Sequence, residues 1–123
     1  MLKSRTTTKY KDGDKLPPIH PGDILRTEFM EPLDLSATKL SLYMGIPLTR
    51  VTAIINGKRG ISPDTALRLA KVFSTSSDLW LNLQSHYDVE QMEYTGEKDK
   101  IDKEARRIAD LQSYAVKRRK VGT

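Results

Sequence analysis

Residues 37–56 read ATKLSLYMGIPLTRVTAIIN, and the spacing of their apolar residues predicts two short helices that cross at a steep angle. One apolar face falls on each side of a central glycine: Leu40 and Met44, then Val51, Ile54 and Ile55. Gly45 permits a tight turn, Ile46 fills the corner between the helices, and Ser41 is small where the second helix passes over it. These constraints, met together and in register, are typical of a helix-turn-helix.

The second helix of this pair has a predicted outward face. At about 100° per residue, burial of Val51 and Ile54 leaves the opposite side to solvent. Asn56 can pair with adenine, Arg50 with guanine or a phosphate, and Ala53 with thymine methyl groups. We therefore expect this side to enter the major groove and read bases through six residues: Leu48, Thr49, Arg50, Thr52, Ala53 and Asn56. Strong donors are few among them, so direct readout is expected to be modest.

Charge is distributed unevenly along the 123-residue chain, whose formal net charge is +5. Residues 1–20 carry five bases and two acids, and residues 95–123 carry nine bases and five acids. Residues 35–63, in contrast, contain four bases and no carboxylate. A surface of one sign indicates a side that faces a polyanion, although a solvated face that happens to lack acids is the alternative. We expect phosphate contacts from Thr38, Lys39, Lys58 and Arg59.

Start and stop signals predict five helices in the central part of the chain. The first begins at Pro21 and ends near Glu31, because Pro32 disfavours helix before it. Four further starts carry a capping or first-turn residue: Ser36, Pro47, Ser62 with Pro63, and Ser76 or Ser77. Trp80 is expected in the core, and strand patterns are missing except for a short edge in the N-terminal arm. The fold class expected is an all-α, five-helix bundle.

Composition divides the chain into three parts. Residues 1–19 lack periodicity and are expected to form a mobile basic arm, and residues 20–92 form the helix-turn-helix DNA-binding domain. Residues 93–123 are expected to form a charged C-terminal helix and tail. An amphipathic stripe recurs there at helical spacing: Ile101, Ala105, Ile108, Leu111 and Ala115. The chain then carries the basic cluster 117–120, which contacts phosphates or solvates the tail.

Several kinds of chemistry are not expected. Zero cysteines exclude structural disulfides and cysteine-ligated metals, and two distant histidines, His20 and His86, are expected to be surface or capping residues. No phosphate-binding loop or nucleophile elbow is present, so we expect neither an enzyme nor a cofactor. No run of apolar residues reaches membrane-spanning length, and a cytoplasmic location is expected.

Five runs in order resemble HigA-type antitoxins of the lambda-repressor-like (XRE) helix-turn-helix superfamily: IHPGDIL at 19–25, EPLDLS at 31–36, NGKRGIS at 56–62, TALRLA at 65–70 and LWLNLQ at 79–84. The resemblance covers about residues 19–92. It implies a lambda-repressor-like bundle and a homodimeric repressor of a palindromic operator, with a RelE-like, messenger-RNA-cleaving toxin as partner. The chain departs from the family at Ala37, where glutamine is common, and at Lys39, which is often acidic.

Two further hypotheses remain open from the sequence. The protein is a stand-alone transcriptional regulator without a toxin, or it is a protein-interaction module whose helix-turn-helix no longer meets DNA. The stripe after Gly96 suits either a toxin-contacting helix or a dimer element, so it does not decide between them.

Overall fold

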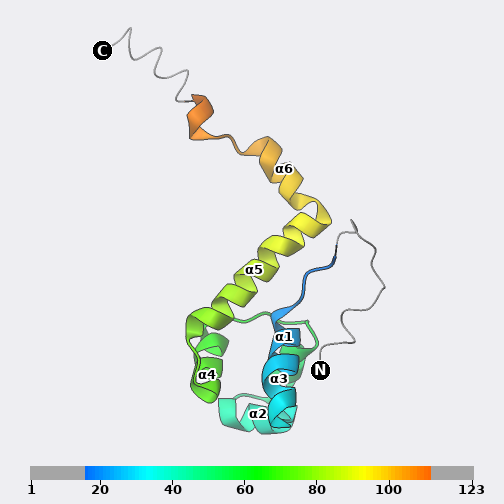
Figure 1. Cartoon of the computed structure of the whole chain (residues 1–123), viewed down its shortest axis with the longest axis vertical. Coiled ribbons are helices and arrows are strands. Elements are labelled where there is room, and N and C mark those ends of the chain that lie inside the picture. The colour runs from blue at the N-terminus through cyan, green and yellow to red at the C-terminus, as the bar shows by residue number, and fades with distance from the viewer. Residues whose placement is uncertain (1–15, 112–123) are drawn as a thin grey trace, which may run out of the picture.

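The computed structural model describes residues 16–111, and within this range the regular elements are all helical (Figure 1). They run in the order α1 (Pro21–Ile24), a π-helical η2 (Leu25–Met30), a 3-10 helix η3 (Glu31–Leu33), α2 (Ala37–Met44), α3 (Leu48–Ile55), α4 (Pro63–Phe73), α5 (Ser77–Thr95) and α6 (Glu97–Glu104). The expected all-α bundle is confirmed. Most of the predicted basic arm and the basic cluster 117–120 lie outside the described residues.

The first helical stretch begins where predicted and ends slightly later. His20 caps it, because its Nδ1 accepts a hydrogen bond from the Gly22 amide at 2.8 Å. The stretch continues past Glu31 through η3, whose first turn tolerates Pro32 because that turn needs no amide there. Asp34 then takes a left-handed conformation, with φ of 51°, and ends the helix.

Serine side chains cap the three helices for which the sequence predicts them. Ser36 accepts from the Lys39 amide at 3.1 Å, Ser62 from Thr65 at 3.3 Å and Ser76 from Leu79 at 3.2 Å. Each bond satisfies an amide that would otherwise lack a partner in the first helical turn. The predicted beginnings of α2, α4 and α5 are confirmed.

Trp80 lies at the centre of the core, as predicted. Its side chain is fully buried, its ring stacks obliquely on Phe29 with centroids 4.7 Å apart, and its Nε1 donates to Thr75 Oγ1 at 2.8 Å. The remaining buried apolar residues come from η2, α2, α3, α4 and the loops on either side of α3: Leu25, Met30, Leu40, Met44, Ile46, Val51, Ile54, Ile61, Ala66 and Leu69. The indole therefore combines a large apolar surface with a satisfied polar atom.

The N-terminus of α1 lies directly against the end of α3. A Cβ at Gly22 would stand 1.9 Å from the carbonyl oxygen of Ile54, a distance that excludes any side chain. Gly22 is therefore required by backbone contact, and it lets α1 pack closely against α3.

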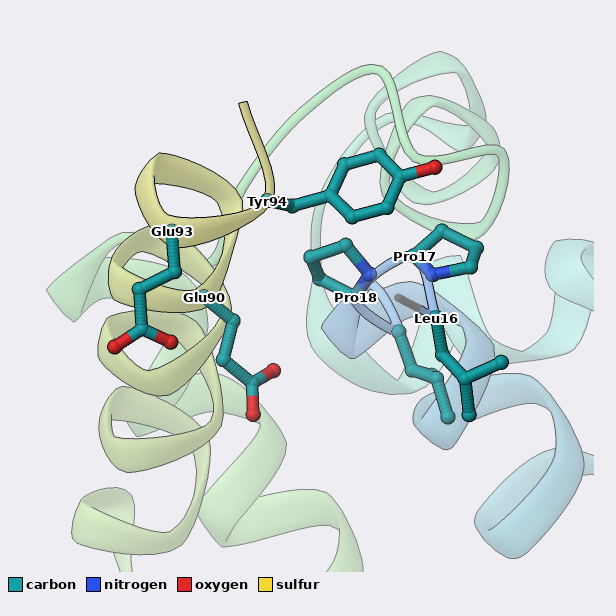
Figure 2. A pocket seen from close by; sticks show the side chains of 7 residues that line it. Leu16, Pro17, Pro18, Glu90, Glu93 and Tyr94 are labelled. Carbon is teal, nitrogen blue, oxygen red and sulfur yellow. The ribbon is translucent and has the colours of Figure 1, made fainter. Parts of the chain in front are cut away.

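The extended residues before α1 run beside the far end of α5. Together they enclose a hollow of about 360 Å³, where the Tyr94 ring lies close to Pro17 and Pro18 (Figure 2). Leu16, Ile19, Glu90 and Glu93 complete its lining.

The C-terminal part differs from the single amphipathic helix that the stripe predicts. α6 ends at Glu104, and Ala105 is extended, with φ of −85° and ψ of 135°. Every residue from Glu97 to Leu111 is exposed, and α6 leads away from the bundle (Figure 1). The prediction of one helix running through this stripe is wrong in its described part, because the thin stripe buries no surface that could hold such a helix together.

We predict that Trp80→Ala lowers the free energy of unfolding by about 3–5 kcal/mol, because it leaves a large cavity in the core. Urea denaturation measures the change. Trp80→Phe is the matched variant and should cost less, since it keeps an aromatic ring but loses the bond to Thr75. Unfolding of Trp80→Ala at the native urea concentration would contradict a core role for the ring.

Candidate nucleic-acid interface

The rotation of α3 places its predicted outward face toward solvent. Val51 and Ile54 are each only 1% exposed and face the core. On the other side Thr49 and Asn56 are exposed, and Ala53 is partly exposed. The structure therefore presents these three side chains together on one surface, in the arrangement that the helical spacing predicts.

The turn between α2 and α3 is built as the sequence predicts. Gly45 takes the left-handed conformation, with φ of 70°, and its amide donates to the Ser41 carbonyl at 2.9 Å. The Ser41 hydroxyl is buried and donates back to the Thr38 carbonyl at 2.7 Å. Ile46 is buried at the corner. A tight turn and a small residue thus let the two helices cross closely.

The C-terminal end of α3 fixes the start of the basic loop. The Gly57 amide donates to the Ile54 carbonyl at 3.0 Å, and the Lys58 amide donates to the Ala53 carbonyl at 2.8 Å. With Gly57 at φ of 76°, this pair of bonds forms a Schellman motif. Lys58 and Arg59 follow directly and are exposed, so their charges are held beside the outward face of α3.

Gln84 of α5 contacts the loop that follows α3 and fixes its position. Its Oε1 accepts from the Ile61 amide at 2.7 Å, and its Nε2 donates to Asp88 at 2.9 Å. The side chain lies so close to Gly60 that a Cβ there would stand 3.0 Å from it. Sequence analysis missed this role of Gln84. The available signal was a polar residue one helical turn after Trp80, on the side of α5 that faces the bundle.

The expected phosphate-contacting residues lie at two separate places beside α3. Thr38 and Lys39 are exposed in the first turn of α2, and Lys58 and Arg59 are exposed after α3. Leu48 is 42% exposed at the beginning of α3, and Thr52 is partly exposed, with its hydroxyl donating to the Thr49 carbonyl at 3.1 Å. The structure therefore keeps all ten predicted side chains at least partly accessible around one helix.

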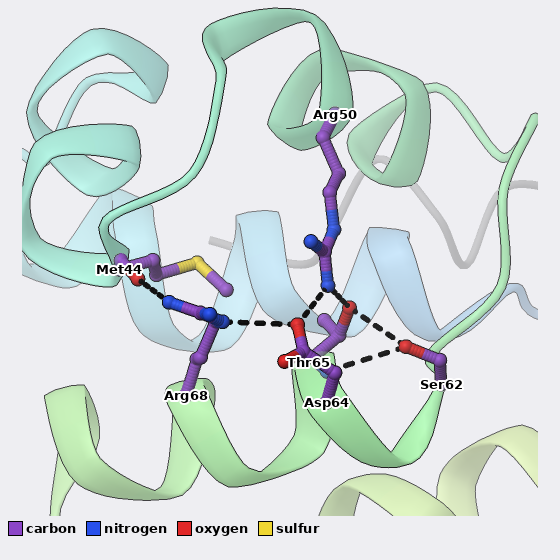
Figure 3. Close-up of polar contacts among 6 residues, drawn as sticks. All are labelled: Met44, Arg50, Ser62, Asp64, Thr65 and Arg68. Carbon is purple, nitrogen blue, oxygen red and sulfur yellow. Dashed lines mark hydrogen bonds and ion pairs between the residues drawn. The ribbon is translucent and has the colours of Figure 1, made fainter.

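Arg50 differs from the other nine in its orientation, because its guanidinium turns back onto α4 (Figure 3). Its Nη2 donates to the Asp64 carboxylate and, at 2.7 Å, to the Thr65 hydroxyl. The side chain is 18% exposed, and Nε is buried. An acid in the first turn of α4 is within reach, so Arg50 binds it instead of extending outward. The structure therefore does not bring Arg50 to the outward face of α3, and its contact with a base or a phosphate stays a prediction.

Asp64 joins Arg50 to a second arginine and to the end of α2. Arg68 Nε donates to the same carboxylate at 2.9 Å, and its Nη1 donates to the Met44 carbonyl at 2.8 Å. These hydrogen bonds, first from Arg68 and then from Arg50, hold the pKa of Asp64 below its ordinary value. Their stabilising effect is present above the ordinary carboxyl pKa and is lost as pH falls through the lowered pKa.

His20 acts as a capping residue, as expected, and it also contacts α5. Its ring meets Tyr87 edge to face, with centroids 4.9 Å apart. Burial lowers the pKa of His20, and the charges of Asp23 and Asp88 oppose that shift. The neutral imidazole is the form that accepts from Gly22. Its contribution to stability is therefore complete above the ordinary histidine pKa and is lost as pH falls through the lowered value.

Two further observations concern metal ligands and apolar helices within residues 16–111. This part of the chain contains no group of three or more potential metal ligands among His, Cys, Asp and Glu. No helix found there is both long and apolar enough to cross a membrane.

Two crossed helices with a solvent-facing second helix define the class of helix-turn-helix regulators. The helix-turn-helix family profile matches residues 28–80. Virulence-associated protein I of Dichelobacter nodosus is 41% identical over 80 residues, covering 65% of this chain and 74% of that protein. The chain belongs to the helix-turn-helix family.

Solved structures of HigA-type antitoxins share the fold. An addiction module antidote protein of the HigA family from Coxiella burnetii is 48% identical, with a TM-score of 0.68 over 75% of this chain and 99% of that one. The Pseudomonas aeruginosa antitoxin HigA, solved with the higBA promoter, is 39% identical, with a TM-score of 0.67 over 72% and 96% of the two chains. The resemblance noted in the sequence is confirmed.

We predict that Arg50→Ala lowers the free energy of unfolding by about 1–2 kcal/mol, because it removes hydrogen bonds to Asp64 and to the buried Thr65. Lys58→Ala is the matched control, since it also removes a base but from an exposed site, and should change stability by less than about 0.5 kcal/mol. Chemical denaturation of both variants makes the comparison. Equal stability of the two would contradict the positioning role of Arg50.

Proposed function

We propose that this protein is a sequence-specific repressor that binds a palindromic operator in double-stranded DNA as a homodimer. The observation that carries the proposal is the outward face of α3, on which Thr49, Ala53 and Asn56 stand together while Val51 and Ile54 are buried beneath them. A helix exposed in this way can enter a major groove. The P. aeruginosa HigA structure with promoter DNA supports this use of the fold.

In this proposal the accessible residues divide into two groups. Base edges are read by Leu48, Thr49, Thr52, Ala53 and Asn56. Phosphates on either side are bound by Thr38, Lys39, Lys58 and Arg59. Arg50 is assigned to holding α3 on α4. Since Asn56 is the one base-reading side chain with a bidentate amide, methyl contacts and the local basic charge supply much of the affinity.

The lack of acids around this face supports DNA as the ligand. Residues 35–63 contain Lys39, Arg50, Lys58 and Arg59 and no carboxylate, and the Asp64 carboxylate that follows is occupied by Arg50 and Arg68. A duplex approaching α3 therefore meets positive charge without a competing negative side chain from this stretch. A protein-interaction module has no need of this arrangement.

We further propose that the protein is the antitoxin of a HigBA-type module, which represses its own operon and neutralises a RelE-like RNase. Similarity to the Coxiella HigA-family antidote, at 48% identity, supports this more specific function. A stand-alone regulator would share the DNA-binding face but have no toxin partner.

We predict that Ala53→Glu abolishes binding to the DNA upstream of the protein's own gene, because it places a carboxylate against the groove. Ser85→Glu is the matched control, adding the same charge at an exposed site of α5, and should bind nearly normally. Fluorescence anisotropy against salt measures both. Lys58→Ala should reduce the slope of log affinity against log salt by about two per dimer, since it removes one phosphate contact from each protomer. Unchanged binding by Ala53→Glu would show that α3 does not enter the groove.

We predict that coexpression of this protein relieves the growth arrest caused by the RelE-like product of an adjacent gene. The Ala53→Glu variant should relieve it as well, because toxin binding does not require the DNA face. Growth curves and co-purification of the two tagged chains provide the measurement. If no adjacent gene encodes a toxin, or if its product neither binds this protein nor is neutralised by it, the protein is a stand-alone regulator.

A further inference from the structure

The loop after α3 carries two of the proposed phosphate contacts, Lys58 and Arg59, and two hydrogen bonds fix its backbone. At its beginning the Lys58 amide donates to the Ala53 carbonyl at 2.8 Å. At its end the Ile61 amide donates to Gln84 Oε1 of α5 at 2.7 Å. Arg59 lies between these points, and within this described loop its own amide makes no hydrogen bond. The direction in which its side chain leaves the backbone therefore depends on both fixed points.

Gln84 reaches this loop because Gly60 has no side chain. A Cβ at Gly60 would stand 3.0 Å from Cδ, Oε1 and Nε2 of Gln84 alike, so one face of the amide group lies directly against the loop. Ile61 is only 4% exposed, and a buried amide that loses its acceptor is costly. The hydrogen bond from Ile61 is therefore the contact through which α5 holds this end of the loop.

Asp88, one helical turn further along α5, determines which end of the Gln84 amide faces the loop. Its Oδ1 accepts a hydrogen bond from Gln84 Nε2 at 2.9 Å. A carboxylate has no proton to donate, so it binds the NH₂ end of the amide and leaves the oxygen for Ile61. Turning the amide over would place two donors together at Ile61 and two acceptors together at Asp88. The hydrogen bonds therefore run in one fixed direction between Asp88, Gln84 and the loop.

We propose that Gln84, oriented by Asp88, is a positioning residue for DNA binding. It holds loop 57–61 in the form in which Lys58 and Arg59 meet the phosphates, although neither Gln84 nor Asp88 touches DNA. The effect is one of preorganisation, because a loop that already has its bound form loses less conformational freedom when the duplex arrives. α5 thereby affects DNA affinity from outside the helix-turn-helix. The inference rests on the DNA binding of the proposed function and adds a pair of supporting residues to it.

Exchange of donor and acceptor tests this arrangement. Gln84→Glu keeps an acceptor for Ile61 but places its other oxygen against the Asp88 carboxylate, and like charges in contact repel. It should raise the Kd for the DNA upstream of the protein's own gene by about tenfold. Gln84→Glu/Asp88→Asn has the native net charge, and its new amide at position 88 can donate to the new carboxylate at position 84. This double variant restores both hydrogen bonds and should bind within about threefold of the native protein.

Two further variants separate position from charge. Ser85→Glu adds the same charge at the neighbouring, exposed position of α5, and should bind nearly normally. Asp88→Asn alone keeps a carbonyl oxygen that can accept from Gln84, so it should also bind within about threefold of the native protein. Fluorescence anisotropy at one salt concentration gives the Kd of each variant. Circular dichroism checks that each is folded at the temperature of the measurement.

Hydrogen exchange of the Ile61 amide, followed by NMR without DNA, reports on the bond itself. Exchange should be faster in Gln84→Glu and return to the native rate in the double variant, in parallel with the recovery of affinity. A role in overall stability alone would instead lower the melting temperature and leave the Kd of the folded protein unchanged.

Three results would overturn the positioning role. They are equal Kd values for Gln84→Glu and Ser85→Glu, a double variant that binds as weakly as Gln84→Glu, and native exchange at Ile61 in the double variant without recovery of affinity. Each of these leaves the proposed function intact, because the native protein still binds the DNA. Failure of the native protein to bind it would refute the proposed function itself, so the two failures are distinguishable.

Discussion

Burial of Val51 and Ile54 sets the rotation of α3, and the outward face depends on that rotation. Each of the two side chains is 1% exposed, and burial of such a side chain contributes roughly 1.5–3 kcal/mol. Turning the helix by a single residue, about 100°, would bring these two side chains toward solvent and move Thr49 and Asn56 toward the core. Both changes are unfavourable, so the same packing that stabilises the bundle also selects the surface that a duplex can reach.

Contacts to backbone atoms then fix the two ends of the helix pair. At the far end of α3, Gly22 packs against the Ile54 carbonyl, and Gln84 accepts from Ile61 in the loop that follows. At the other end, Arg68 donates to the Met44 carbonyl that ends α2. Such contacts constrain the chain without using any side chain of the outward face. The residues of that face are therefore able to vary with the operator while the framework that presents them is kept.

Local signals in the sequence were enough to predict the helices, but not the partners of every polar side chain. Caps such as Ser36 and the turn at Gly45 act within one or two helical turns, so the printed residues determine them. The contact of Arg50 with Asp64 was not predicted, because the two residues lie 14 positions apart and the sequence shows Asp64 only as an acid suited to a helix start. The end of α6 at Glu104 was missed for a related reason: apolar spacing predicts a helical face, but whether that face is covered depends on tertiary contacts.

Charge of opposite sign is concentrated in two different parts of the chain, around α3 and on α5. The acid-free stretch 35–63 includes α3, whereas α5 carries four acids and no Lys or Arg. Phosphates that are attracted to Lys58 and Arg59 are repelled by α5, so a duplex has one favourable side on which to approach.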